Sequence, residues 1–99
     1  MPENRVIIVG AGPTGLSLAL SLGLAGIPVL LLEAEPALHH ESRGAAYHPP
    51  TLEIFDRLGV ADRMLALGIR APQWQIRDRV DGLVAEFDLG LIADRTPFP

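Results

Sequence analysis

The amino-acid sequence predicts an α/β fold that opens with a βαβ unit, the first unit of a doubly wound parallel sheet. Two short apolar runs, Val6–Val9 and Val29–Leu32, have the length and the aliphatic character of strands that are buried on both faces. Between them, residues 13–24 are rich in leucine and alanine and carry no charge, which is typical of a buried helix. Two such strands joined by a helix pair in parallel through a right-handed crossover.

A transmembrane segment is the competing interpretation of this region. Residues 6–32 contain 27 residues without a charge, which is enough to span a bilayer as a helix. Glycines and prolines divide the stretch into three elements. They are Gly10, Gly12, Pro13, Gly15, Gly23, Gly26 and Pro28. Because parallel strands buried on both faces also give continuous apolar runs, we expect no membrane span and no membrane partner.

Downstream of the second strand, the sequence predicts a loop and then two short helices. Residues 34–50 are polar and irregular, and they end in a Pro-Pro pair that suits the entry to a helix. Residues 51–58 carry apolar side chains at helical spacing, and Gly59 followed by Val60 indicates a left-handed helix stop with a hydrophobic contact. A second short helix is expected over Ala61–Leu67, ending at Gly68.

The last part of the chain predicts a β-hairpin. Residues 73–77 and 83–88 both alternate apolar and polar side chains, and Asp81-Gly82 between them has the composition of a two-residue turn. This alternation predicts one buried face on the hairpin. We expect Trp74, Phe87 and, from the preceding helix, Phe55 to pack in the core. No further element is expected in residues 89–99.

These elements predict two incomplete domains. Residues 1–71 would hold the βαβ unit and the following helices, and residues 72–99 would start a second layer with the hairpin. Two parallel strands and one hairpin cannot cover the apolar helix and sheet, because parallel sheets need helices on both sides. We therefore expect the 99 residues to be the N-terminal piece of a larger protein, and to fold poorly or aggregate when they are isolated.

The composition excludes several classes of function. Twelve acids outweigh eight bases, giving a net charge of −4, and all eight bases are arginines scattered along the chain. No basic face therefore indicates a nucleic-acid partner. The absence of cysteine excludes disulfides, zinc–thiolate sites and thiol catalysis, and residues 1–5 do not predict a signal peptide. Both observations favour the reducing cytoplasm as the location.

Three glycines at a specific spacing lie where the first strand meets the helix. The segment consists of Gly10, Ala11, Gly12, Pro13, Thr14 and Gly15. In a Rossmann-like unit the first glycine permits the tight turn, the second lets backbone N–H groups approach a pyrophosphate, and the third lets the helix pack closely on the strand. The phosphate charge would lie at the positive end of the helix, where the missing N–H of proline costs nothing.

Glu33 is the acid that such a unit requires, 18 residues beyond Gly15 at the end of the second strand. Its carboxylate can accept hydrogen bonds from an adenosine ribose, and its charge would repel a ribose 2′-phosphate. These residues predict an ADP group and leave open which dinucleotide carries it.

Arg43, in the loop after the second strand, is a candidate for pairing with the pyrophosphate, because a guanidinium supplies bidentate donors. His39, His40 and His48 lack partners at catalytic or ligand spacing. We therefore predict that the histidines are surface residues and that the chain holds no metal.

Four segments together resemble the FAD-dependent aromatic hydroxylases, the single-component flavoprotein monooxygenases. They are Val-Ile-Ile-Val-Gly-Ala-Gly-Pro-Thr-Gly-Leu from Val6, Leu-Leu-Glu ending at Glu33, Ser-Arg-Gly at residues 42–44, and Thr-Leu-Glu-Ile-Phe-Asp-Arg-Leu-Gly-Val from Thr51. The first segment is shared by many flavoproteins, whereas the arginine loop and the later helix are narrower. Gly44 departs from the alanine that many relatives carry there.

The resemblance implies that the glycine turn and Glu33 hold the ADP part of FAD and that Arg43 lies near its pyrophosphate. The predicted cofactor-binding residues are Gly10, Ala11, Gly12, Pro13, Thr14, Gly15, Glu33 and Arg43. In the complete enzymes of this family, NAD(P)H reduces FAD, and O2 then serves to hydroxylate a phenolic or otherwise electron-rich aromatic ring.

Family members are several times longer than 99 residues, so this chain would be the FAD-binding N-terminal portion of such an enzyme and inactive alone. No residue in it can be named as a catalytic acid, base or nucleophile. Two alternatives stay open: an NAD-dependent dehydrogenase, and a truncated, non-catalytic polypeptide that binds a nucleotide or a partner. Nothing in the sequence selects the aromatic substrate, NADH over NADPH, or an oligomeric state.

Overall fold

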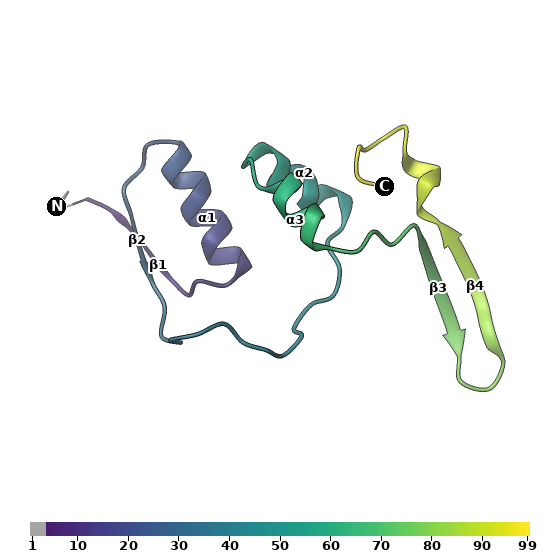
Figure 1. Ribbon diagram of the computed structural model, residues 1–99. Coiled ribbons are helices and arrows are strands. Elements are labelled where there is room, and N and C mark those ends of the chain that lie inside the picture. The colour runs from purple at the N-terminus through teal and green to yellow at the C-terminus, as the bar shows by residue number, and fades with distance from the viewer. Residues whose placement is uncertain (1–3) are drawn as a thin grey trace. The chain divides into compact units, whose positions relative to one another are not determined.

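The computed structural model describes residues 4–99, which fall into two compact units, one ending at Ala45 and the other covering Ala46–Pro99. Figure 1 shows the helices and strands in chain order. The first unit contains β1 (Val6–Val9), α1 (Pro13–Leu24) and β2 (Val29–Leu32). The second contains α2 (Pro49–Arg57), α3 (Ala61–Leu67), β3 (Gln73–Asp78), β4 (Gly82–Asp88) and the 3-10 helix η1 (Leu89–Ile92). The predicted α/β class is therefore confirmed.

The first unit has the strand, helix and strand that its apolar pattern predicts. β1 and β2 pair in parallel, in a register that runs from Val6 opposite Val29 to Val9 opposite Leu32. The ladder continues for one residue beyond β1, because the N–H of Gly10 donates to the carbonyl of Leu32 at 2.7 Å. Because of this register, Gly10, at the start of the glycine turn, lies beside the end of β2.

Helix α1 begins and ends at residues that suit those positions. Pro13 occupies the first helical position, where it fits because no intrahelical hydrogen bond is lost. At the other end Gly26 adopts a φ of +74°. The N–H of Gly26 donates to Gly23 at 3.0 Å and that of Ile27 donates to Leu22 at 2.9 Å. This is the Schellman pattern, which satisfies the last carbonyls of a helix and turns the chain toward β2.

The apolar faces of α1 are largely uncovered. In the described chain this helix has no buried side chain, and Leu16, Leu18 and Leu24 are 51%, 46% and 65% exposed. Within the same range the buried hydrophobic side chains are Ile8, Phe55 and Ala61. Such a helix needs cover on more than one side, as its sequence predicts. Over residues 4–99, none of the helices combines the length and the apolar character that crossing a membrane requires.

In the second unit, α2 starts two residues earlier than the sequence predicts. Pro49 and Pro50 form its first turn, after His48 in an extended conformation, so the Pro-Pro pair lies inside the helix and not before it. The predicted stop is confirmed: Gly59 adopts a φ of +78°, and the N–H groups of Gly59 and Val60 each donate at 2.9 Å, to Asp56 and Phe55. α3 also has the predicted bounds.

A small core forms around Phe55, which is 6% exposed. The ring of Tyr47 meets it edge-on, with 5.3 Å between centroids and an interplanar angle of 76°. Ala61, at the start of α3, is 1% exposed. The prediction that Phe55 packs in the core is therefore confirmed.

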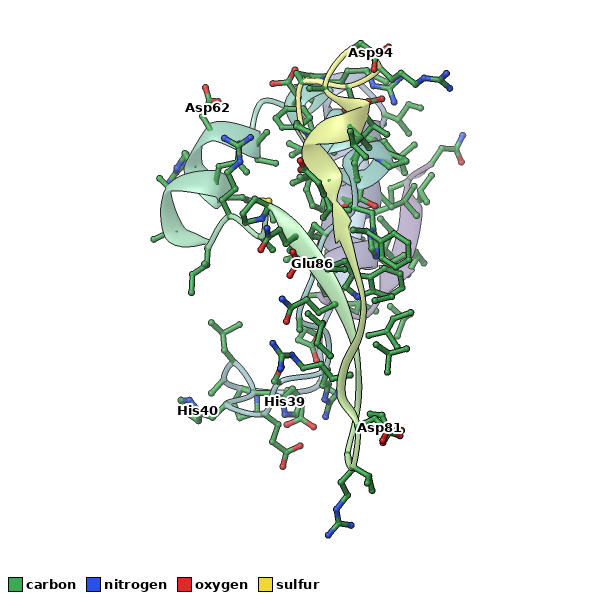
Figure 2. The ribbon with its side chains drawn as sticks, turned by 90° about the vertical axis from the view of Figure 1, so that its right-hand side faces the viewer. His39, His40, Asp62, Asp81, Glu86 and Asp94 are labelled. Carbon is green, nitrogen blue, oxygen red and sulfur yellow. The ribbon has the colours of Figure 1, made fainter. Side chains whose placement is uncertain are left out.

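The hairpin of β3 and β4 is antiparallel, but its predicted two-residue turn at Asp81-Gly82 is wrong. Gly82 is the first residue of β4 and lies opposite Asp78, so residues 79–81 form the loop. The Asp78 carboxylate accepts from the N–H groups of Val80 at 2.7 Å and Asp81 at 2.9 Å. These bonds stabilise a loop that begins directly after Asp78, before the predicted turn. In Figure 2, Asp81 lies at the tip of the hairpin.

The expected core packing of Trp74 and Phe87 is also wrong for the described chain. The two residues lie opposite each other, with 6.0 Å between ring centroids, but they are 62% and 47% exposed. A register shift after Ile76 places Arg77 opposite Leu83, which interrupts the alternation of the hairpin faces. Strand alternation shows which side chains share a face; whether that face is buried depends on what packs against it.

The sequence analysis misses the 3-10 helix η1. Its first turn is fixed by Asp88, whose carboxylate accepts from the N–H of Gly90 at 2.8 Å. The N–H of Leu89 also donates to the carbonyl of Pro72 at 3.0 Å, which ties the end of β4 to the residue before β3. A four-residue helix is too short for hydrophobic periodicity to predict.

We predict that Gly59→Ala lowers the free energy of unfolding by about 1–2 kcal/mol, because an L residue is strained at positive φ. The matched control is Gly68→Ala, since Gly68 also follows a helix but has a φ of −94°. Thermal unfolding of both variants in the full-length protein measures the difference. Equal Tm values for the two variants would contradict the assignment.

Candidate functional site

The glycine turn joins β1 to α1 and is shaped by its backbone. Gly10 adopts a φ of +103°, a backbone conformation that residues with a side chain rarely adopt. Gly12 is the N-cap of α1, with an extended backbone at φ −74° and ψ −178°. A Cβ added to Gly10 or Gly12 would meet no described atom within 4 Å, so the turn presents open backbone on that side.

Gly15 is packed far more tightly than the other two glycines. A Cβ at this position would lie 1.9 Å from the carbonyl oxygen of Gly10 and 3.5 Å from Cγ2 of Ile8. Real Cβ atoms do not approach backbone oxygen so closely, so only glycine fits without moving the helix. The missing side chain therefore permits the first turn of α1 to lie against the end of β1.

The N-terminus of α1 has donors without helical partners. The first hydrogen bond after the turn runs from Leu16 N to Gly12 O at 2.9 Å, so the N–H groups of Thr14 and Gly15 precede the helical ladder. Within the described chain, no side chain caps this end and its first turn holds no acid. Free N–H groups and the helix dipole together favour an anion at this position.

Glu33 follows β2 and lies beside the turn. Its Oε2 accepts from the N–H of Ala11 at 2.7 Å, and its Oε1 accepts from the N–H of Glu35 at 2.8 Å. These bonds, first that from Glu35 and then that from Ala11, lower the pKa of the Glu33 carboxyl below its ordinary value of 4.5. The carboxylate is therefore charged at neutral pH. Each oxygen still has an acceptor position for a further hydroxyl.

The structure brings the glycine turn and Glu33 together, but it does not bring Arg43 to them by any hydrogen bond recorded for residues 4–99. Arg43 is exposed, on a segment without regular secondary structure. His39 and His40, labelled in Figure 2, lie on the same loop and are exposed as predicted. Among the described residues, no group of three or more His, Cys, Asp or Glu side chains could hold a metal ion.

Sequence reasoning misses the donor role of Ala11. The parallel register offers the signal that could have found it: because Val9 lies opposite Leu32, the residues that follow the two strands are neighbours. An acid after β2 can therefore reach the backbone of the turn as well as a ligand.

The arrangement fits the ADP part of a dinucleotide. Open backbone at Gly10 and Gly12 leaves room for a pyrophosphate, the N–H groups at the start of α1 can donate to it, and the carboxylate of Glu33 can accept from ribose hydroxyls. No residue of this set is a nucleophile or a general base positioned for bond-making. The site can hold and orient a nucleotide, and any chemistry would come from the cofactor.

The pKa of Glu33 predicts how stability depends on pH. Because the pKa is lower in the folded state, the carboxylate contributes stability above pH 4.5 and loses it as the pH falls through the folded pKa. In the apoprotein, Glu33→Gln should therefore lower Tm most near pH 7, and the difference from wild type should shrink between roughly pH 5 and 3. Glu41→Gln, on the same exposed loop, is the control. A Glu33→Gln difference that does not vary with pH would contradict this account.

Two monooxygenases are similar to nearly the whole chain. Para-nitrophenol 4-monooxygenase from Pseudomonas sp. (strain WBC-3) is 38% identical over 96 residues, which cover 97% of this chain and 24% of that enzyme. 6-hydroxy-3-succinoylpyridine 3-monooxygenase HspB from Pseudomonas putida (strain DSM 28022 / S16) is 37% identical over 97 residues, 98% of this chain and 25% of that enzyme. The chain thus spans about a quarter of the length of these relatives.

A solved structure and a family model agree with these relatives. The crystal structure of p-nitrophenol 4-monooxygenase PnpA from Pseudomonas putida DLL-E4 matches with a TM-score of 0.89 and 36% identity, over 97% of this chain and 24% of that one. The model of the FAD binding domain family matches residues 3–93. The predicted resemblance to flavin-dependent monooxygenases is confirmed, and the chain belongs to the FAD binding domain family.

Proposed function

We propose that this chain is the FAD-binding N-terminal portion of a flavin-dependent monooxygenase that hydroxylates an aromatic, phenolic substrate with NAD(P)H and O2. The observation that carries the proposal is the similarity to para-nitrophenol 4-monooxygenase over 97% of the chain, at 38% identity. The family match over residues 3–93 supports FAD as the cofactor. Because the relatives are about four times longer, the activity belongs to the full-length protein and the 99 residues alone are inactive.

The glycine turn and Glu33 are the proposed site for the ADP part of FAD. The open backbone at Gly10 and Gly12 and the donors at the start of α1 support a pyrophosphate there, and the charged carboxylate of Glu33 supports a ribose diol beside it. The full proposed set is Gly10, Ala11, Gly12, Pro13, Thr14, Gly15, Glu33 and Arg43.

Arg43 is proposed to approach the pyrophosphate when the cofactor is bound. Its exposed guanidinium has no hydrogen bond recorded in the described part of the chain, and it carries the charge that a pyrophosphate would pair with. Glu33, by contrast, would disfavour a ribose that carries a 2′-phosphate.

The proposed organisation follows the sequence pattern. Residues 1–71 would belong to a doubly wound, Rossmann-like FAD-binding domain whose first parallel pair is β1 and β2, and residues 72–99 would begin the sheet of a substrate domain. The uncovered faces of α1 support the first part of this proposal, because such a helix needs neighbours on several sides. The absence of cysteine suits work in the cytoplasm.

When bound, the flavin would supply the transfer of electrons from NAD(P)H and the activation of O2. The residues of this chain would bind the far end of the cofactor and fix its position. The close packing that Gly15 permits and the bonds at Glu33 would hold the turn, so that a bound dinucleotide would have one defined location. An NAD-dependent dehydrogenase uses the same kind of turn and acid, but the match to an FAD binding domain family and to monooxygenases favours flavin.

The test is purification of the protein from its natural full-length reading frame, without added cofactor. We expect a yellow protein with the absorption bands of oxidised flavin, and NAD(P)H-dependent O2 uptake that rises when phenols are added, with 4-nitrophenol and hydroquinone as probes. Cyclohexanol is the control, because it has a hydroxyl group without an aromatic ring. A colourless protein that retains NAD would overturn the proposal in favour of the dehydrogenase.

A further inference from the structure

The hydrogen bond between Glu33 and Ala11 connects two segments that lie 22 residues apart. Oε2 of Glu33 accepts from the backbone of the glycine turn at 2.7 Å, while Oε1 accepts from the N–H of Glu35 at 2.8 Å. Both bonds form in the protein alone. The proposed ribose contact does not account for them, because that contact needs only a carboxylate beside the nucleotide.

The turn is hydrogen-bonded at both ends, by the N–H of Gly10 to Leu32 and by the carbonyl of Gly12 from Leu16, and between them the N–H of Ala11 is bound by Glu33. A Cβ at either glycine would meet no described atom within 4 Å, so the turn is open on the side where these side chains would lie. Glycines also lose more conformational entropy on ordering than other residues. A backbone N–H bound by a charged acceptor at 2.7 Å therefore restricts the middle of a glycine-rich turn.

We propose that Glu33 is a positioning residue for the pyrophosphate turn, in addition to its role toward the ribose. By accepting the N–H of Ala11, it holds the turn in its binding conformation before the nucleotide arrives, and so removes part of the ordering cost of binding. This inference rests on the proposed function, since it concerns the same nucleotide site.

The two roles of Glu33 are compatible within one carboxylate. An ionised carboxylate offers about four acceptor positions, and the bonds to Ala11 and Glu35 use one on each oxygen. A ribose diol can therefore bind without displacing the N–H of Ala11. It follows that a change at Glu33 should also weaken ligands that lack the diol.

Two ligands and two variants separate these roles. ADP carries the ribose diol and the pyrophosphate, whereas 2′,3′-dideoxy-ADP keeps only the pyrophosphate. In the flavin-free full-length protein, we expect Glu33→Ala to weaken binding of 2′,3′-dideoxy-ADP roughly fivefold, as the loss of one hydrogen bond predicts. Glu33→Gln keeps one acceptor oxygen, which can accept from the N–H of Ala11 or from that of Glu35 but not from both, so its Kd for this ligand should lie between those of wild type and Glu33→Ala.

The two variants distinguish the effect of Glu33 on the position of the turn from the effect of its negative charge on phosphate binding. Loss of the negative charge alone would tighten binding of the phosphates in both variants, whereas a positioning role weakens binding, and most in Glu33→Ala, where both acceptor oxygens are lost. An unchanged Kd of 2′,3′-dideoxy-ADP in Glu33→Ala, with a weakened Kd of ADP, would overturn the proposal, because Glu33 would then act on the ribose alone.

A second measurement does not depend on a ligand. Amide hydrogen exchange at Ala11 in the flavin-free protein should accelerate at least roughly fivefold in Glu33→Ala and stay unchanged in Glu41→Ala. Equal exchange in wild type and Glu33→Ala would also overturn the proposal. If wild type bound neither ligand, the proposed function would fail, and exchange at Ala11 would still decide whether Glu33 holds the turn.

Discussion

The close approach of Gly15 to the carbonyl of Gly10 is the constraint on which the proposed nucleotide site depends. A Cβ on Gly15 would lie 1.9 Å from that oxygen, so the helix can start this close to β1 only because residue 15 has no side chain. This close approach places the free N–H groups of the first helical turn beside the end of β1. Gly10, at a φ of +103°, provides the reversal that makes this approach possible.

The distribution of charge around the turn follows from this geometry. An uncapped helix N-terminus carries partial positive charge, and the described first turn of α1 holds no acid that would neutralise it. Glu33 places a full negative charge beside the turn but directs both oxygens at backbone N–H groups, of Ala11 and Glu35. The site thus separates a donor region suited to an anion from an acceptor suited to hydroxyls. In the proposed function, that separation would be the basis for recognising an ADP group.

The sequence predicts the first unit to the residue, because glycines and prolines interrupt its apolar runs after β1, after α1 and before β2, and the charged Glu33 ends the run of β2. The glycine turn and the position of Glu33 follow from the same pattern. The bond from Ala11 to Glu33 is not visible in a pattern, since it joins a backbone group to a side chain through the register of two strands. Arg43 lies on a segment without regular structure, for which periodicity predicts no position.

The second unit shows where local rules are insufficient. The stop after α2 was predictable, because Gly59 and Val60 satisfy carbonyls within the same helix. The hairpin loop was not, because Asp78 binds two backbone N–H groups and moves the turn away from Asp81-Gly82. Alternation places Trp74 and Phe87 together, but their burial depends on neighbours that strand pairing alone does not supply.

The most direct test of the central claim is the flavin content of Gly15→Ala in the full-length protein, compared with Gly23→Ala in the same helix. A Cβ at Gly23 would meet no described atom within 4 Å, so this variant controls for the change from glycine to alanine in α1. We predict that Gly23→Ala retains FAD, whereas Gly15→Ala is purified with little or none because the helix must move away from β1. Equal and full flavin content in both variants would contradict the assignment of this turn as the cofactor site.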